Sequence, residues 1–369
     1  MRVAIIHYWL INWRGGEKVL KAIADLFPDA DIYTHVAAPD LIARELPGRN
    51  VSTTFIANLP FARRNYQKYL PLMPMALEQI DLRSYDLVIS SDSGPAKGVV
   101  TPPGTLHICY CHSPMRYVWD LYQDYREQAG GLTRLFMAPM LHYVRLWDYV
   151  SAQRVDHYAA NSRFVASRVA KYYRRSSEVI YPPVAVDEFD FSQSAEDFYL
   201  SVGQLVPYKR ADLLVKAFNI LGRRLVLIGD GNALPELRKI AKENVLLLGY
   251  QPDDVVKDHY ARCRALVFPN VEDFGIVPVE AMASGKPVIA LGCGGALETV
   301  IDGVSGLLFH EQTVDGLVEA VRKFESLAER FDPKLIRVHA TQFSQANFNL
   351  KFQKFVEAKL GGQPAIYDD

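Results

Sequence analysis

The sequence predicts an α/β protein with two doubly wound parallel sheets, and three observations lead to that prediction. Short apolar runs typical of buried strands alternate with segments of helical spacing along most of the chain. Glycine-containing loops follow several of these runs. The pair Pro182-Pro183 interrupts the alternation near the middle, where we expect the domain boundary. We therefore expect domains over residues 1–182 and 183–345, followed by a helix and tail over 346–369.

The composition is that of a globular protein. At 369 residues, with 49% hydrophobic and 22% charged residues, the chain can form two separate cores. A net charge of -1 argues against nucleic acid as the main partner, because there is no overall basic excess to neutralise phosphates. The four cysteines form neither a Cys-x-x-Cys pair nor a zinc spacing, which is typical of a reducing cytoplasm. No apolar run approaches the roughly 18 residues of a membrane span, and we expect no signal peptide.

The first domain opens with a strand over residues 3–8 and a helix over 17–26. The turn between them contains Gly15 and Gly16. Residues without a Cβ atom let backbone N–H groups approach a phosphate closely at such a turn. Taken alone, a Gly-Gly pair is more often an ordinary turn.

Further buried strands are expected, and one of them ends at a histidine. These strands cover residues 86–90, 106–111, 158–161 and 179–181. His112 follows the second of them, at the carboxyl edge of the sheet, where an imidazole can hydrogen-bond a sugar hydroxyl. A lone histidine is usually structural. The nearby Arg116, Tyr117 and Trp119 mix aromatic and charged groups, as a carbohydrate-binding surface does, although they could equally line the cleft between the domains.

The second domain repeats the pattern of strand and helix, with strands over residues 198–202, 224–228, 245–248, 265–269 and 288–291. Lys209 and Arg210 lie between the first of these strands and a helix that begins at Ala211. An ammonium group at this strand end can bind a diphosphate, whereas the alternative is an ordinary surface lysine. Arg210 either adds to that charge or faces solvent.

A loop over residues 270–276 leads into a helix that has Pro278 in its first turn. Backbone N–H groups at this junction, which comprises Phe274, Gly275 and Ile276, suit a diphosphate. The carboxylates of Glu272 and Glu280, the latter expected in the first helical turn, can accept hydrogen bonds from sugar or ribose hydroxyls. The alternative is that Glu272 is a solvated loop acid and Glu280 a helix-dipole partner.

The two glutamates, eight positions apart with Phe-Gly between them and EAMASGKPV beginning at the second, closely resemble the nucleotide-binding motif of retaining GT-B glycosyltransferases. The resemblance is to the glycogen-synthase-like family four, and it covers nearly the whole chain. It implies two Rossmann-like domains facing across a cleft, with a C-terminal helix that crosses back to the first domain.

The resemblance also implies roles for particular residues. His112, Lys209 and Glu272 would be catalytic, and Gly15 and Gly16 would face the donor diphosphate. The remaining donor-binding positions would be Gly203, Arg210, Asp254, Phe274, Gly275, Ile276 and Glu280. Many members of the family carry an arginine directly after the glycine that corresponds to Gly203, whereas this chain has Gln204. Phosphate neutralisation therefore depends more on Lys209.

The amino-terminal half resembles bacterial mannosyltransferases of surface-polysaccharide and O-antigen assembly, on the stretches LPLMP, SYDLVISSDS and CYCHSPMRYVWD. GDP-mannose is then the expected donor, without a metal or other cofactor. The expected acceptor is a saccharide, soluble or linked to a polyprenyl diphosphate, and the expected location is the cytoplasm at the inner face of the membrane. The alternatives are a UDP-sugar-dependent hexosyltransferase, a sugar-nucleotide epimerase and a non-catalytic protein that binds a nucleotide sugar.

A segment over residues 60–77 predicts a peripheral membrane contact. Arg63, Arg64 and Lys68 alternate there with aromatic and aliphatic residues. Such a segment can lie on anionic headgroups, with its aromatic rings at the interface. The alternative is that the apolar side chains pack on the first domain while the basic ones face water.

Overall fold

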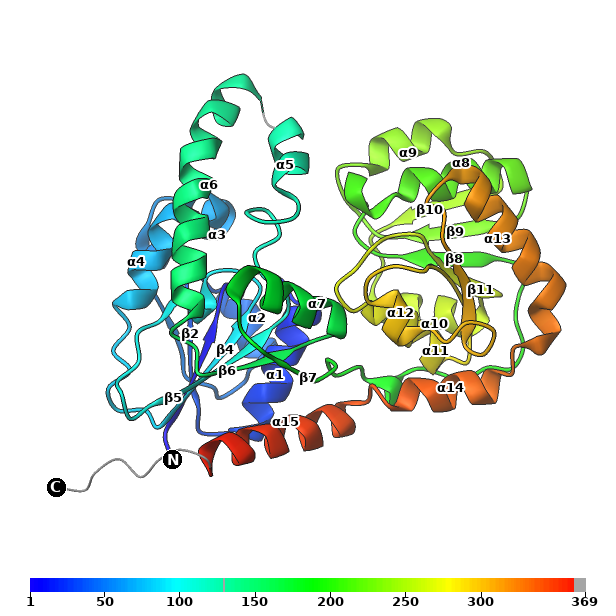
Figure 1. Cartoon of the computed structure of the whole chain (residues 1–369). Coiled ribbons are helices and arrows are strands. Elements are labelled where there is room, and N and C mark those ends of the chain that lie inside the picture. The colour runs from blue at the N-terminus through cyan, green and yellow to red at the C-terminus, as the bar shows by residue number, and fades with distance from the viewer. Residues whose placement is uncertain (129, 362–369) are drawn as a thin grey trace. The chain divides into compact units, whose positions relative to one another are not determined.

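The computed structural model describes residues 1–128 and 130–361, and the chain forms two compact units (Figure 1). The first unit holds Met1–Tyr181 and the described residues from Phe348 onward, and the second holds Pro182–Asn347. Each unit is organised around one parallel sheet with helices packed on it. The predicted α/β class with two doubly wound sheets is therefore confirmed.

The described strands of the first unit pair in the order β3-β2-β1-β4-β5-β6-β7, and every pairing is parallel. Strand β1 lies between β2 and β4, so the direction of winding reverses between β1 and β4. Doubly wound sheets bind ligands at the carboxyl ends of strands at such a switch point. The strands are β1 Val3–His7, β2 Asp31–Thr34, β3 Val51–Thr53, β4 Leu87–Asp92, β5 Leu106–Cys111, β6 His157–Ala160 and β7 Glu178–Val179.

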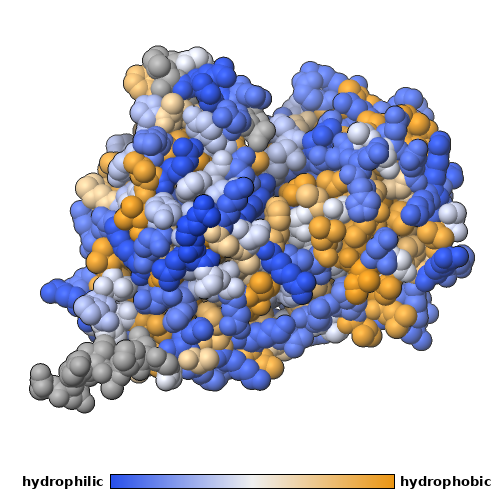
Figure 2. All heavy atoms as spheres, in the orientation of Figure 1, coloured by the Kyte–Doolittle hydropathy of each residue, from blue (hydrophilic) through white to orange (hydrophobic). Residues whose placement is uncertain are grey.

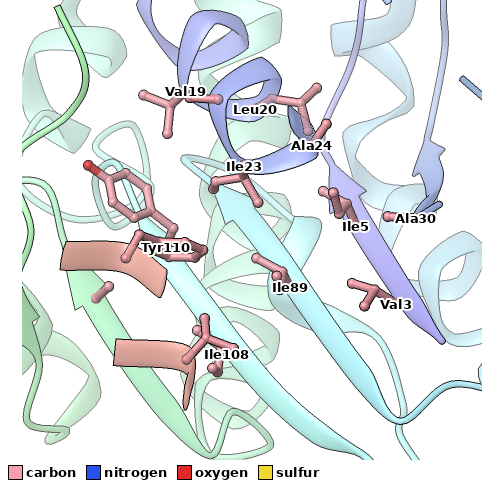
Figure 3. Packing of buried hydrophobic residues seen from close by; sticks show 14 of the residues in the cluster. Val3, Ile5, Val19, Leu20, Ile23, Ala24, Ala30, Ile89, Ile108 and Tyr110 are labelled. Atoms are coloured by element: carbon pink, nitrogen blue, oxygen red, sulfur yellow. The ribbon is translucent and has the colours of Figure 1, made fainter. Parts of the chain in front are cut away.

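Helices cover both faces of this sheet. Leu20 and Ile23 of the first helix point onto Ile5 of β1 and Ile89 of β4 (Figure 3). The helices of the unit are α1 Gly15–Leu26, α2 Pro39–Glu45, η1 Phe55–Asn58, α3 Ala62–Asn65, η2 Tyr66–Leu72, α4 Met73–Glu78, η3 Ala96–Gly98, α5 Tyr122–Gln128, α6 Gly131–Ala152, α7 Arg163–Arg168, η4 Val169–Tyr173 and α15 Gln345–Leu360.

The last helix, α15, belongs to the core of the first unit although it follows the second unit in the chain. Phe348, Phe352 and Phe355 are buried in the same cluster as the inner face of α1. The rings of Phe348 and Phe352 both lie edge-on to Tyr110 of β5, with centroids 5.7 Å and 6.0 Å away. Their helical spacing directs these rings to one face. The expected return of the C-terminal helix to the first domain is therefore confirmed.

The opposite face of the sheet is covered by α6 and α4. Leu141 and Val144 of α6 and Leu77 of α4 pack with Ile6 and Val88. These strand residues alternate with the ones beneath α1, as expected for a sheet that is buried on both faces.

A buried ionic network, which the sequence did not indicate, joins β4, η3 and α6. Lys97 is fully buried, and its Nζ contacts the carboxylates of Asp92, at 3.3 Å, and Asp148. The hydroxyl of Tyr173 and the Nε1 of Trp119 donate hydrogen bonds to Asp148 at 3.0 Å and 2.7 Å. Burial alone would lower the pKa of Lys97, but the carboxylates of Asp148 and Asp92 raise it above its ordinary value. Lys97 therefore stays charged and compensates two buried carboxylates.

The second unit has a sheet of the same type, in the order β10-β9-β8-β11-β12-β13, with its switch point between β8 and β11. Its strands are β8 Tyr199–Val202, β9 Leu225–Ile228, β10 Val245–Gly249, β11 Ala265–Phe268, β12 Val288–Leu291 and β13 Gly306–Phe309. Its helices are η5 Val186–Glu188, η6 Pro207–Lys209, α8 Ala211–Leu221, α9 Leu234–Ile240, α10 Asp253–Arg262, α11 Ile276–Ala283, α12 Ala296–Thr299, α13 Val314–Leu327, η7 Ala328–Arg330 and α14 Pro333–Thr341.

Several element ends differ from the sequence prediction. The strand expected over residues 179–181 is Glu178–Val179 and stops before the two prolines. The strand expected over 86–90 runs from Leu87 to Asp92, so that Ser91 and Asp92 join Ser90 in the sheet. These polar side chains are buried and have hydrogen-bond partners that local sequence does not reveal: Ser90 and Ser91 bond to histidines of the neighbouring strands, and Asp92 bonds to Lys97 of η3.

The surface is mixed in polarity, and Figure 2 shows apolar side chains gathered over α12 and the loop after it. Leu297, Ile301 and Val304 are exposed there. Among the described residues, no helix has the length and apolar character needed to cross a bilayer.

The ionic network predicts a large effect of removing Lys97. We expect Lys97→Met to lower the free energy of unfolding by about 3–5 kcal/mol, because two buried carboxylates lose their counter-charge. Urea unfolding followed by circular dichroism measures the change. The matched control is Lys21→Met, because the pair of Lys21 with Asp25 is solvent-exposed and should contribute less than about 1 kcal/mol. Equal effects of the two substitutions would contradict this account.

Candidate functional site

The carboxyl edge of the second sheet collects several of the predicted donor-binding residues. Gly203 follows β8 and has a φ of 149°, a conformation that disfavours any residue with a Cβ. A Cβ atom added to Gly203 would lie 3.9 Å from the Nζ of Lys209 in η6. Strand β8 pairs with β11 at the switch point, so the loop that carries Glu272 starts beside it. The structure thus brings Gly203, Lys209 and the Glu272 loop to one edge.

Lys209 and Glu272 form an ion pair at this edge. The Nζ of Lys209 lies 2.7 Å from Oε1 of Glu272, and the side chains are 22% and 28% exposed. The Nδ2 of Asn270 donates to the same oxygen at 2.9 Å. Asn270, which the sequence analysis did not single out, thereby orients the carboxylate. The pair presents an ammonium group and a carboxylate side by side, which suits a ligand with both phosphate oxygens and hydroxyl groups.

At the junction between this loop and α11, the groups that could bind a ligand are backbone N–H groups rather than side chains. Gly275 is the N-cap of α11 and has a φ of 89°, and Ile276 is the first helical residue. The ring of Phe274 is buried against Phe343, with centroids 5.4 Å apart, so this side chain serves the core. Only the backbone of Phe274 can therefore serve the donor site that the sequence predicted.

The position of Glu280 differs from the prediction. Helix α11 begins at Ile276, so Glu280 lies in the second turn and not in the first. Its Oε2 accepts a hydrogen bond of 2.9 Å from the hydroxyl of Tyr260 in α10. Burial, and next the carboxylate of Glu280, raise the pKa of Tyr260 well above its ordinary value, so this hydroxyl remains a donor. Tyr260 thereby orients the carboxylate of Glu280, and sequence reasoning missed this contact because the two helices meet only in the folded unit.

Two further donor-binding predictions fall on exposed positions. Arg210 is the N-cap of α8, with a φ of 55°, and its Nε donates to Asp212 at 3.2 Å. It therefore serves its own helix rather than Lys209. Asp254 is exposed in the first turn of α10, where a carboxylate is a favourable dipole partner.

In the first unit, Gly16 and His112 lie close together at the switch point. Gly15 and Gly16 open α1 directly after the loop that follows β1, as predicted. A Cβ atom added to Gly16 would overlap the hydroxyl of Tyr8 and lie 3.9 Å from the Nε2 of His112. Glycine is thus needed at position 16 for close packing. The backbone N–H of His112 donates to the carbonyl of Asp92 at 2.7 Å, which extends the β4–β5 pairing by one residue.

His112 is a neutral imidazole. Burial, the largest cause, lowers its pKa to about 3. The folded protein therefore holds it uncharged throughout the neutral range, and its ring nitrogens act as one hydrogen-bond donor and one acceptor.

The predicted acceptor-side residues are tied into the first unit. The hydroxyl of Tyr117 donates to the sulfur of Met115, and the Nε of Arg116 lies 3.5 Å from Asp120. Trp119 donates its indole N–H to the buried Asp148 and stacks on Tyr172, with ring centroids 4.8 Å apart. Only its ring could therefore contact a saccharide. Among the described residues, no three His, Cys, Asp or Glu side chains are grouped as a metal site would require.

Both halves of the chain match known families. Residues 13–188 match the family described as Glycosyltransferase Family 4, and residues 187–334 match the one described as Glycosyl transferases group 1. Glycosyltransferase family models therefore match the chain from residue 13 to residue 334. The resemblance stated from the sequence motifs is therefore confirmed.

Relatives of this glycosyltransferase include enzymes named for mannosyl transfer. It is 30% identical over 192 residues to a GDP-mannose-dependent alpha-(1-6)-phosphatidylinositol monomannoside mannosyltransferase of Mycolicibacterium smegmatis, covering 43% of this chain and 50% of that protein. It is 27% identical over 210 residues to the O-antigen chain mannosyltransferase RfbU of Salmonella typhimurium, covering 52% and 60%. The chain spans about half to two thirds of the length of the curated relatives it matches.

The solved structure of HepE from Anabaena in complex with UDP and glucose has the same fold. Its TM-score is 0.73 with 19% sequence identity, and the match covers 97% of this chain and 100% of that one. The predicted GT-B fold is therefore confirmed.

The Lys209–Glu272 pair yields a direct test of the site. We expect Lys209→Ala and Glu272→Gln each to reduce sugar transfer at least ~100-fold, the scale for loss of one pre-organised charge-stabilising group. Neither should lower the free energy of unfolding by more than about 1 kcal/mol, because both side chains are partly exposed. Initial rates with radiolabelled donor and thermal unfolding measure the two effects. The control is Lys216→Ala, which removes an exposed lysine of the neighbouring helix. Near-normal transfer by a folded Lys209 or Glu272 variant would exclude that residue from the site.

Proposed function

We propose that this protein is a retaining hexosyltransferase that moves mannose from GDP-mannose onto a saccharide acceptor, without a metal ion. The observation that carries the proposal is the Lys209–Glu272 pair beside Gly203 at the switch point of the second sheet. In this proposal the ammonium of Lys209 and the backbone N–H groups at the start of α11 stabilise the charge that develops on the departing diphosphate. Glu272 accepts hydrogen bonds from hydroxyl groups of the donor sugar.

The proposed reaction forms a bond between an acceptor oxygen and the anomeric carbon while the bond from that carbon to the donor diphosphate breaks. The departing phosphate takes the acceptor proton on the same face. A protein nucleophile is not required, so the two-carboxylate scheme of retaining hydrolases does not apply. His112, which is neutral, hydrogen-bonds a sugar hydroxyl beside Gly16.

The choice of mannose is supported by the names of the relatives and by the amino-terminal motifs. Asp254 in the first turn of α10 can accept hydrogen bonds from the N1–H and the amino group of guanine. The alternative is a UDP-sugar donor, supported by the structural neighbour solved with UDP and glucose. An epimerase would convert free donor without acceptor, and a non-catalytic binding protein would bind donor without any transfer.

The donor assignment predicts an order of ligand stabilisation. We expect GDP to raise the thermal midpoint more than UDP, ADP or dTDP at equal concentration, because a ligand at 100 times its Kd adds about 2.7 kcal/mol of stability. Differential scanning fluorimetry measures the shifts. Lys209→Ala serves as the control and should show a smaller shift with every diphosphate. A UDP shift equal to or larger than the GDP shift would refute the mannose assignment.

We also propose that the acceptor is a saccharide linked to a membrane lipid and that the first unit contacts an anionic membrane surface at the cytoplasmic face. The basic segment, residues 60–77, exposes Arg63, Arg64 and Lys68, and Phe61 is 78% exposed. Tyr66 instead packs on Trp9, and Met73 is buried. Tyr66 and Met73 thus pack on the first unit, and the exposed residues of the segment are the ones that we propose to contact the membrane.

Helix α6 adds an apolar surface beside this segment. Phe136, Tyr143, Leu146 and Val150 are 65%, 49%, 55% and 54% exposed, and their spacing places them on the face opposite the core. Helix α6 lies next to α4, because the Nε1 of Trp147 donates to Glu78 at 3.4 Å (Figure 1).

The charges of these two elements favour an anionic bilayer over a second copy of the chain. Residues 60–77 contain no acidic residue, and the acid of α6, Asp148, is buried. Two copies facing each other here would juxtapose basic side chains, whereas anionic lipid would neutralise them.

The membrane proposal predicts charge-dependent binding to vesicles. We expect binding to vesicles of phosphatidylcholine with phosphatidylglycerol to fall about 100-fold on joint replacement of Arg63, Arg64 and Lys68 by Glu, because each basic residue near the surface contributes about 1 kcal/mol. Co-sedimentation of the protein with the vesicles measures the binding. The matched control replaces Lys18, Lys21 and Lys354 by Glu, on helices α1 and α15. Equal losses in the two variants, or self-association without vesicle binding, would refute the placement.

A further inference from the structure

A row of buried polar side chains leads from the start of α1 to His112. Oε1 of Glu17 lies 3.8 Å from Nε2 of His7, and Nδ1 of His7 lies 3.2 Å from the hydroxyl of Ser91. That hydroxyl lies 2.8 Å from Nε2 of His112. Glu17, His7 and Ser91 are all buried, whereas His112 is half-buried. The side chains of Glu17, His7, Ser91 and His112 can each donate or accept a proton or a hydrogen bond, and they therefore form one connected series.

Strand pairing places this series at the switch point. His7 and Ser91 are direct partners in the parallel pairing of β1 with β4. His112 is the residue after β5, which pairs with β4 on its other side. Glu17 sits in the first turn of α1, where its Oε2 accepts the backbone N–H of Arg14 at 2.9 Å. The carboxylate is thereby anchored beside His7 and cannot turn away without losing that bond.

The carboxylate of Glu17 determines which nitrogen of His7 carries the proton. Nε2 of His7 has no hydrogen-bond partner within the described residues, and Glu17 is the charged group that it faces. A lone pair aimed at a buried carboxylate is repelled, whereas an N–H is attracted, and low polarity strengthens both effects. We therefore assign a single proton to His7, on the Nε2 that faces Glu17.

The remaining protons along the series follow from this choice. Nδ1 of His7, without a proton, accepts the hydroxyl hydrogen of Ser91. The Ser91 oxygen then has only acceptor capacity left for His112, so Nε2 of His112 must be the N–H that donates to it. Because His112 is neutral, its Nδ1 is left without a proton. No described residue is hydrogen-bonded to that nitrogen.

We propose that Glu17, His7 and Ser91 are positioning residues that hold His112 in the Nε2–H tautomer, so that Nδ1 accepts a hydrogen bond from a substrate hydroxyl. The inference rests on the proposed sugar transfer for the nature of the substrate. An acceptor nitrogen repels phosphate oxygens and selects groups that donate, such as the hydroxyls of a hexose. His112 would then orient the sugar.

The tautomer can be read directly from the protein without any substrate. Two-bond ¹⁵N–¹H correlation spectra of protein labelled in its nine histidines distinguish protonated from unprotonated ring nitrogens, and His112→Gln assigns the His112 signals. We expect Nε2 of His112 to show the protonated shift and Nδ1 the unprotonated one. A proton on Nδ1 of His112, or two protons on His7, in the unmodified protein would overturn the proposal without recourse to any variant.

Variants test whether Glu17 and Ser91 cause the preference of His112 for the Nε2–H tautomer. In Glu17→Gln the amide N–H can donate a hydrogen bond to Nε2 of His7. We then expect the hydrogen bonds of the series to reverse their direction and the population of the Nδ1–H tautomer of His112 to rise. Ser91→Ala should leave a mixture of the two forms, and Ser91→Thr, which keeps the hydroxyl, should restore the original one. The matched control is Ser90→Ala, because Ser90 bonds the Nε2 of the buried His107 at 3.0 Å and does not touch His112. An unchanged His112 spectrum in both Glu17→Gln and Ser91→Ala would overturn the proposal.

Kinetics separate this role from a merely structural one. We expect Ser91→Ala to lower the kcat of transfer by about 10-fold to 100-fold, the range for partners that orient a functional histidine. GDP binding should be unchanged, because the proposed hydrogen bond from His112 goes to a hydroxyl of the hexose, which GDP lacks. Ser91→Thr should recover most of the kcat, and a loss of GDP affinity equal to the loss of kcat would contradict the positioning role. Failure of the mannose assignment alone would leave the tautomer result intact.

Discussion

The parallel pairing of β1 with β4 is the constraint on which the first unit depends. It makes His7 and Ser91 partners, sets the switch point between them, and places the turn into α1 beside the end of β5. Gly16 and His112, which are 96 positions apart in the chain by their residue numbers, meet as a result. Because both faces of the sheet are covered by helices, the strands cannot slip by one residue without exposing their apolar side chains.

In the second unit, a different pair of strands brings the candidate site residues together. Strand β8 pairs with β11, and the loops after them carry Lys209 and Glu272 into direct contact. The absence of Cβ atoms is essential here, because a Cβ on Gly229 would overlap the carbonyl of Gly203. The two switch points therefore carry different groups, an ion pair of Lys209 with Glu272 in the second unit and the imidazole of His112 in the first.

Buried polar groups connect stability with the site in the first unit. Lys97 compensates Asp92 and Asp148, and the backbone carbonyl of Asp92 accepts the N–H of His112. The same aspartate thus ends the strand, balances the buried lysine and holds the histidine backbone. Such a network is stable only when every member is present, since removing one partner leaves a buried charge without compensation.

The sequence by itself determined the fold class, most strand positions, and the residues at the two strand edges, because apolar periodicity and glycine placement are local properties. The resemblance to a family likewise singled out Lys209, Glu272 and His112 as candidate site residues. Only the tertiary structure decided that Lys209 contacts Glu272, that Glu280 lies one turn further along and bonds Tyr260, and that the ring of Phe274 belongs to the core. The tertiary structure alone decided that Glu17, His7 and Ser91 form a series of polar contacts that ends at His112. These contacts join residues from different strands and helices, and their partners are set by strand register and helix packing, which no local pattern encodes.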